Sequence, residues 1–254
     1  MICLTITTSK RLDLFMQTIE SFVKYCDDID LFDAIIHYDD SSSNEDREKM
    51  NLILNNLFYN KLICTRRFNK ESFQTKRRHC EIMKIWKKDI ESLNFDYVFH
   101  LEDDWLFIKN FNVHDGIEIL KNREEIALIG YSWQKKKFPF DIFIPEIING
   151  YWEWFYSNKY KVNEVLWLDE VEIQYLPKGH WVKIFNSPYF GFRPAIHDIQ
   201  KLKTLNTFDV NVDGFELEFS IRFSEKFKSF CHSDRIVYHI GNERSSYLIN
   251  DSTR

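Results

Sequence analysis

The chain has 254 residues, enough for one large α/β domain, and its 44% hydrophobic and 29% charged residues are typical of a globular protein rather than a disordered one. The formal net charge of -5 disfavours a nonspecific nucleic-acid binder, because such proteins need a basic excess to neutralise phosphates. The 5 cysteines are scattered without a CxxC pair, so we expect reduced thiols and a cytoplasmic location rather than a disulfide framework or a zinc knuckle.

The start of the sequence lacks a charged segment followed by a long apolar one, so we expect no targeting peptide. No apolar run approaches the roughly 20 residues needed to span a bilayer. We therefore expect no transmembrane segment, and contact with a membrane surface stays open.

The first half of the chain alternates strand-like and helix-like patterns. The expected strands are 2–7, 34–38, 62–65 and 97–101, and the expected helices are 11–25, a helix from Ser43 or Asn44 to about Leu57, and 75–90. Such alternation predicts βαβ units, and hence an α/β fold with a mostly parallel, Rossmann-like central sheet flanked by helices.

The second half is less regular. We expect a strand at 126–131, a hairpin formed by 171–175 and 181–185, a helix within 208–227, and a last strand at 235–240, while 133–160 reads as loops. We see no repeat and no clear linker, which predicts a single domain over 1–254.

Three polar clusters follow three of the expected strands. They are Thr8–Arg11, Asp39–Ser43 and Glu102–Asp104. Because ligands of open α/β sheets bind at the carboxyl ends of the strands, neighbouring strands would bring these clusters to one rim.

The acidic triplet Glu102, Asp103 and Asp104 is the sharpest signal in the sequence. Three acids directly after an apolar strand repel one another unless a cation neutralises them, and hard oxygen ligands suit Mg²⁺ or Mn²⁺. Such a cation can stabilise a departing nucleotide as a Lewis acid. The alternative is an acidic turn in solvent.

These motifs together resemble those of the GT-A glycosyltransferases, in particular the family-two branch. FHLEDDWLF resembles the strand and DxD motif of that fold, DDSSS the DDxS segment, and ITTSKRLDLFMQTIESF the opening strand, loop and helix. The resemblance is strongest over 1–110. It implies that 1–110 is the nucleotide-sugar-binding half and 111–254 the acceptor-binding half of one catalytic domain.

The resemblance also implies roles by position. The residues placed beside the nucleotide are Thr7, Arg11, Asp39 and Asp40. Asp104 matches the direct metal ligand, Glu102 matches the other outer acid, and Asp103 would face the sugar or the metal. Ser42 replaces a common glycine of the DDGS form.

Further cations and one histidine belong to the same expected site. Lys76, Arg77 and Arg78 could neutralise a diphosphate, although a solvated helix start explains them as well. His239 lies in a segment that resembles the family's late metal-binding or diphosphate-binding histidine, which favours Mn²⁺ over Mg²⁺. Arg244 could then close over phosphate. A structural role for His239 stays open.

The stretch FELEFSIRF resembles the family's ED-x-x-L-x-x-R helix. Counting back from Arg222 places Glu216 at the catalytic-base position, with Asp213 as the nearby competitor. Physically, an inverting transfer needs a carboxylate to take the proton of the acceptor hydroxyl. Glu216 and Glu218 could also be ordinary acids on a helix surface.

Aromatic residues provide the candidate acceptor contacts. Trp152 and Trp154 could stack on a sugar, and SPYFGFRPAI resembles a segment near the acceptor, which makes Phe190 and Arg193 candidates. The competing interpretation is core packing, because large aromatic side chains dominate protein cores.

These inferences predict a metal-dependent glycosyltransferase that moves a sugar from a nucleoside-diphosphate sugar, with UDP favoured, to a hydroxyl of a glycan or lipid-linked glycan. Inversion of the anomeric centre is favoured. The alternatives are a nucleotidyltransferase using the same acids, a metal-dependent nuclease, and a non-catalytic glycan-binding domain of the same fold. TTSKR lacks the glycines usual in nucleotidyltransferases.

Overall fold

The computed structural model describes residues 1–69, 78–131, 169–175, 181–186, 190–208, 215–232 and 236–241. These residues form one nine-stranded sheet and a separate two-stranded sheet. The loops expected over 133–160 lie outside the described residues. None of the described helices is both long and apolar enough to cross a membrane.

The large sheet has the strand order β3-β2-β1-β4-β9-β6-β10-β8-β7 in the described part of the chain. Its strands are β1 (Ile2–Thr8), β2 (Phe32–Asp40), β3 (Leu62–Phe68), β4 (Tyr97–Glu102), β6 (Ile126–Gly130), β7 (Asp169–Tyr175), β8 (Trp181–Asn186), β9 (Ala195–Asp198) and β10 (Lys228–His232). β1 to β4 form a parallel block, and β9 runs antiparallel between β4 and β6. The predicted α/β fold with a parallel first half is confirmed, and so is the hairpin of β7 and β8.

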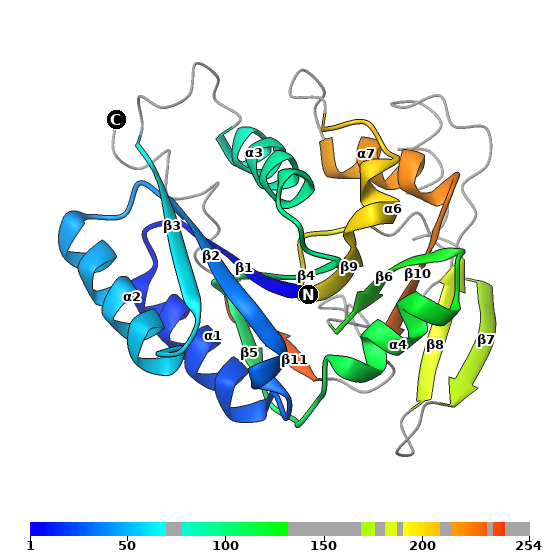
Figure 1. The fold of residues 1–254 in the computed structure, drawn as a ribbon, viewed down its shortest axis with the longest axis horizontal. Helices are drawn as coiled ribbons and strands as arrows, with labels where there is room; N and C mark the ends of the chain where they lie inside the picture. Colours follow the sequence, from blue (N-terminus) through cyan, green and yellow to red (C-terminus); the bar gives the residue numbers. More distant parts are fainter. Residues whose placement is uncertain are drawn as a thin grey trace, which may run out of the picture.

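The helices cover both faces of the sheet, as Figure 1 shows. They are α1 (Leu12–Tyr25), α2 (Asn44–Leu57), α3 (Arg78–Ser92), α4 (His114–Asn122), α6 (Ile199–Lys203) and α7 (Phe215–Ser224), with a short 3-10 helix at Ile29–Leu31. α1, α2 and α4 pack into one apolar cluster, and α3, α6 and α7 pack into a second.

The local sequence explains why α1, α2 and β1 form where they do. In α1, Phe15, Ile19 and Phe22 recur at three- and four-residue spacing, and all three side chains are fully buried against the sheet. The Ser43 side chain accepts a hydrogen bond from the backbone N–H of Asp46 and so caps α2, as its sequence predicts. Every residue of β1 is buried, which fits its place between β2 and β4.

His197 on β9 gives the fold a pH-dependent stability. Neither of its ring nitrogens has a hydrogen-bond partner, and the ring packs against Trp86 and Phe190 with centroids 5.8 and 5.3 Å apart. Burial lowers the pKa of His197 to about 3 from its ordinary 6.5. The unfolded chain therefore takes up this proton near pH 6.5 and the folded chain near pH 3, so stability is lost as the pH falls through that window.

We expect the His197→Leu variant to gain stability over the wild type when the pH falls from about 7.5 to about 5, by about 2 kcal/mol, because leucine cannot be protonated. Urea unfolding of both proteins at the two pH values measures this gain. A stability difference that is the same at both pH values would contradict the assignment to His197.

Candidate active site

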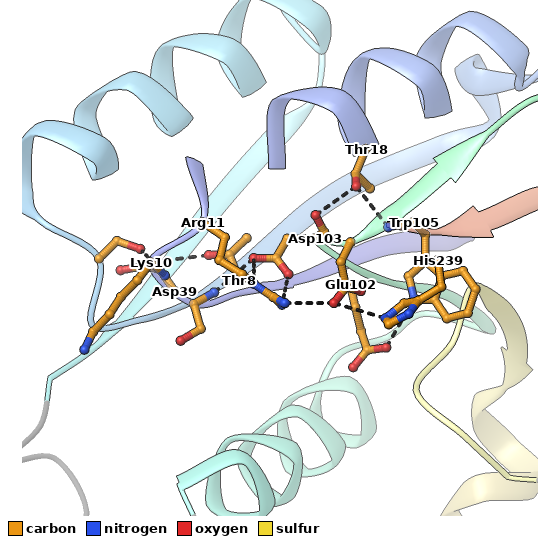
Figure 2. Close-up of polar contacts among 12 residues, drawn as sticks. Thr8, Lys10, Arg11, Thr18, Asp39, Glu102, Asp103, Trp105 and His239 are labelled. Carbon is orange, nitrogen blue, oxygen red and sulfur yellow. Dashed lines mark hydrogen bonds and ion pairs between the residues drawn. The ribbon is translucent and has the colours of Figure 1, made fainter. Parts of the chain in front are cut away.

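The three polar clusters meet at the carboxyl ends of β1, β2 and β4. The backbone N–H of Ser9 donates to Asp103 at 3.1 Å, which joins the β1 loop to the β4 loop. The backbone N–H of Lys10 donates to the Ser42 side chain at 3.1 Å, which joins the β1 loop to the β2 loop. The convergence predicted from the strand pattern is therefore confirmed (Figure 2).

Two residues in these loops adopt a left-handed backbone, Lys10 with φ 55° and Ser41 with φ 62°. Such a conformation costs a non-glycine residue energy and tends to persist where surrounding structure fixes it. Ser41 is therefore the residue with the left-handed backbone conformation that the glycine of the DDGS form would adopt easily. This corrects the assignment of that position to Ser42, whose side chain instead accepts the Lys10 hydrogen bond.

Arg11 binds two of the three acids of the triplet. Its Nε and Nη2 donate to the two carboxylate oxygens of Asp103, and its Nη1 donates to Oδ2 of Asp104 at 2.8 Å. All three side chains are buried or nearly so. Thr18 on α1 fixes the backbone there, because its hydroxyl donates to the Asp103 carbonyl and accepts from the Trp105 N–H. The sequence predicts Arg11 beside a nucleotide, and the structure shows it bound to Asp103 and Asp104.

Asp104 has two oxygens in different surroundings. Oδ2 receives the Arg11 hydrogen bond and lies 3.3 Å from Nε2 of His239, whereas Oδ1 is buried without a hydrogen-bond partner. Burial alone would raise the pKa of Asp104, but the hydrogen bond from His239 and the charge of Arg11 outweigh burial and lower it. Asp104 is therefore held as a carboxylate with one oxygen left over.

His239 reaches this point through the small antiparallel sheet of β5 (Trp105–Phe107) and β11 (Val237–His239). The register pairs His239 with Trp105, and their rings lie 4.9 Å apart. The backbone N–H of Ile240 donates to the Asp104 carbonyl at 2.8 Å. The predicted last strand thus exists as a short strand that joins β5, and it carries His239 to the acidic triplet (Figure 2).

Gly241 packs directly on Asp104. A Cβ atom at this position would lie 2.8 Å from Cβ and 2.9 Å from Cγ of Asp104, closer than real carbon atoms approach. We expect the Gly241→Ala variant to push Asp104 out of place and, at the metal site proposed below, to weaken Mn²⁺ binding by about tenfold or more, equivalent to about 1.4 kcal/mol.

Gly191→Ala is a matched control, because among the described residues a Cβ there meets only Cγ of Arg193, at the ordinary distance of 3.9 Å. Titration of both purified variants with Mn²⁺ compares them directly. Equal Mn²⁺ affinity in the two variants would mean that Asp104 tolerates displacement.

Glu102, His79 and Glu216 form the outer side of the site. Burial, with the nearby carboxylates of Asp104 and Glu216, raises the pKa of Glu102 to about 8. Glu102 accepts a hydrogen bond from the Trp105 indole at 3.3 Å. His79 at the start of α3 lies 3.4 Å from Glu216 at the start of α7. Burial alone would lower the pKa of His79, but the Glu216 carboxylate outweighs burial and raises it.

The β2 end of the site is held by two arginines. Asp39 is fully buried, and it accepts hydrogen bonds from Arg47 on α2 and from the Thr8 hydroxyl. Asp40 accepts from Arg78, the first residue of α3. The Asp39 carboxylate therefore has hydrogen-bond partners on both of its oxygens within the protein. Thr7 on β1, which the sequence also predicts beside the nucleotide, is paired with Glu102 in the register of β1 and β4.

Phe190 is part of the core. It is 4% exposed, and its ring packs against Phe219 and Phe223. This burial favours core packing, the competing interpretation of Phe190, over contact with an acceptor. Arg193 is half-buried. The remaining predicted site residues lie outside the described residues: Lys76, Arg77, Trp152, Trp154, Asp213 and Arg244.

Sequence reasoning missed several residues of the site. Arg47, His79 and Gly241 each touch a predicted site residue, but none of them stands in a recognisable motif. The only signal for His79 was its place one residue after Arg78 in the basic stretch.

The donor chemistry of the site fits a divalent cation. Within the described residues, no group of three or more His, Cys, Asp or Glu side chains is arranged so that it could hold a metal ion. The buried, unpartnered Oδ1 of Asp104 nevertheless offers a hard oxygen ligand beside Glu102 and His239. Carboxylates with one imidazole suit Mn²⁺.

Comparison with known proteins places the fold. No protein-family model matches the sequence, and no curated protein matches it significantly. Mannosyltransferase PcManGT from Pyrobaculum calidifontis, in complex with GDP-Man and Mn²⁺, matches with a TM-score of 0.56 and 9% identity over 98% of this chain and 59% of that chain. S. aureus TarS 1-349 matches with a TM-score of 0.57 and 11% identity over 95% and 61%.

A third solved structure, GalNAc-T7 with UDP, GalNAc and Mn²⁺, matches with a TM-score of 0.54 and 11% identity over 94% of this chain and 44% of that chain. The chain thus has the GT-A fold, which confirms the fold that its motifs predict. It spans 59% and 61% of the first two structures that it matches.

Proposed function

We propose that the protein is a metal-dependent glycosyltransferase. It would transfer a sugar from a nucleoside-diphosphate sugar, with UDP favoured as the nucleotide, to a hydroxyl of a glycan or lipid-linked glycan. The observation that carries the proposal is the meeting of Glu102–Asp104 with Arg11, His239 and Glu216 at the carboxyl rim of a GT-A sheet.

Asp104, Glu102 and His239 would hold the cation, which we propose to be Mn²⁺ or Mg²⁺. Burial among like charges makes the ionised form of Glu102 costly in the ligand-free protein, and a cation would remove that cost. When bound, the cation supplies positive charge that stabilises the departing diphosphate. Thr7, Arg11, Asp40 and Arg78 would line the donor side of the site.

Glu216 would act as the catalytic base. The acceptor oxygen would form a bond to the anomeric carbon while the bond from that carbon to the diphosphate oxygen breaks, with inversion. Glu216 would take the hydroxyl proton, and the nucleoside diphosphate would leave with the electron pair. Its neighbour Glu218 is less suited, because both of its oxygens accept hydrogen bonds from Arg222.

Thermal unfolding with UDP, GDP, CDP and dTDP, each with Mn²⁺, Mg²⁺ or EDTA, tests the proposal. A nucleotide at about 100 times its dissociation constant stabilises by about 2.7 kcal/mol, which raises the midpoint by roughly 5–10 °C in a domain of this size. We expect that rise with one nucleoside diphosphate and its loss with EDTA.

Other outcomes point to the alternatives. In a parallel series with the corresponding nucleoside triphosphates, a rise with a triphosphate but with no diphosphate would favour a nucleotidyltransferase. No rise with any nucleotide at millimolar concentration would contradict donor binding and favour a glycan-binding domain.

A further inference from the structure

Arg11 holds the two aspartates in unequal ways. Two of its donors, Nε and Nη2, bind Asp103, whereas a single donor, Nη1, binds Asp104. Asp103 has a further tie, because it accepts the Ser9 N–H at 3.1 Å. Arg11 can therefore give up Asp104 and stay anchored on Asp103.

The oxygen that Arg11 binds is the crowded one. Oδ2 of Asp104 has Arg11 at 2.8 Å and His239 at 3.3 Å, while Oδ1 is buried and has no hydrogen-bond partner. A divalent cation that binds Asp104 must come close to the guanidinium. The side chains of Arg11 and Asp104 are only 9% and 10% exposed, so water screens the repulsion between the two cations poorly.

We propose that Arg11 is a built-in counter-cation that competes with the divalent cation for Asp104 and keeps metal affinity low until a diphosphate is present. The inference rests on the metal site of the proposed function and adds a binding order to it. A guanidinium matches diphosphate oxygens in a two-point fork, so an arriving diphosphate offers Nη1 a new anion. Metal and donor would then bind together, and each would strengthen the binding of the other.

The decisive experiment is a titration of the protein with Mn²⁺, carried out without nucleotide and with UDP or GDP. The electron paramagnetic resonance signal of the free ion measures how much Mn²⁺ is left unbound. The variant is the double substitution Arg11→Gln with Asp103→Asn, which removes the guanidinium together with the carboxylate that accepts two of its hydrogen bonds, while Asp104 keeps its contact with His239 at 3.3 Å. Asp103→Asn alone is the matched control, because it keeps Arg11.

Without nucleotide, we expect the double variant to bind Mn²⁺ at least about tenfold more tightly than Asp103→Asn, equivalent to about 1.4 kcal/mol. We expect the nucleoside diphosphate to tighten Mn²⁺ binding more in the single variant than in the double variant. Equal or weaker Mn²⁺ binding by the double variant would overturn the competition.

The wild-type protein gives an independent check if the double variant does not fold. Mn²⁺ binding that is as tight without a nucleoside diphosphate as with one would also overturn the competition, while leaving the metal site in place. If no protein binds Mn²⁺ under any of these conditions, both the competition and the proposed metal site fail.

Discussion

The Asp104→Asn variant should lose sugar transfer by about a thousandfold or more while still folding. Asparagine keeps the size of the side chain and an oxygen that can accept the Arg11 hydrogen bond, but it loses the negative charge. Lewis-acid stabilisation of a leaving group contributes several kcal/mol, and each 1.36 kcal/mol is a tenfold change in rate. The measurement is kcat/KM at saturating Mn²⁺, together with Mn²⁺ affinity.

Glu118→Gln is the control for this substitution. Glu118 lies on the exposed side of α4 and pairs with Lys121 at the surface, so its loss should leave transfer and Mn²⁺ affinity unchanged. Normal transfer by Asp104→Asn would show that Asp104 is not the metal ligand. Loss of transfer together with loss of the folded structure would be detected by thermal unfolding and would not count as support.

The parallel block of the fold could be predicted because each of its elements carries its own signal. Phe15, Ile19 and Phe22 mark one face of α1, and Ser43 supplies a cap for α2. β1 is a short, buried run of β-branched and apolar residues. Such local patterns depend on neighbours along the chain, and they therefore survive without any knowledge of tertiary contacts.

The rest of the fold depends on contacts that local patterns do not encode. β9 has four residues and β5 has three, too few to show a period of two. The antiparallel insertion of β9 between β4 and β6 places His197 beside Val98 and Leu128, which are far from it in the sequence, and no local signal gives that pairing. The pairing of β11 with β5 was missed for the same reason.

The residues of the site also fall into those that local sequence predicts and those that depend on long-range contacts. Glu102–Asp104 was found because the residues are adjacent and follow a strand. The ion pairs of Arg11 with Asp103 and of His79 with Glu216 join residues 92 and 137 positions apart, respectively, as their numbers show. For Phe190 the sequence left acceptor contact and core packing open, because an aromatic residue in a loop-like sequence has the same appearance whether it faces a ligand or the core.

Glu216→Gln should lower kcat by about a hundredfold to ten-thousandfold, the range expected when a general base is lost, with little change in Mn²⁺ or donor affinity. Glutamine keeps the shape of the side chain but cannot take the acceptor proton. The contact with His79 at 3.4 Å places the Glu216 carboxylate on the side of the site that faces Glu102, near the proposed cation. Steady-state kinetics with the donor found by thermal unfolding measures the change.

Glu218→Gln separates the role of Glu216 from the charge of the helix as a whole. Both acids lie in the first turn of α7, but the two oxygens of Glu218 accept hydrogen bonds from Arg222 at 2.5 and 2.7 Å. A carboxylate engaged at both oxygens by an arginine is less available to bind an acceptor hydroxyl. Glu218→Gln should therefore cost stability more than kcat. If it lowers kcat as much as Glu216→Gln does, then α7 contributes its charge to the site and not one specific base.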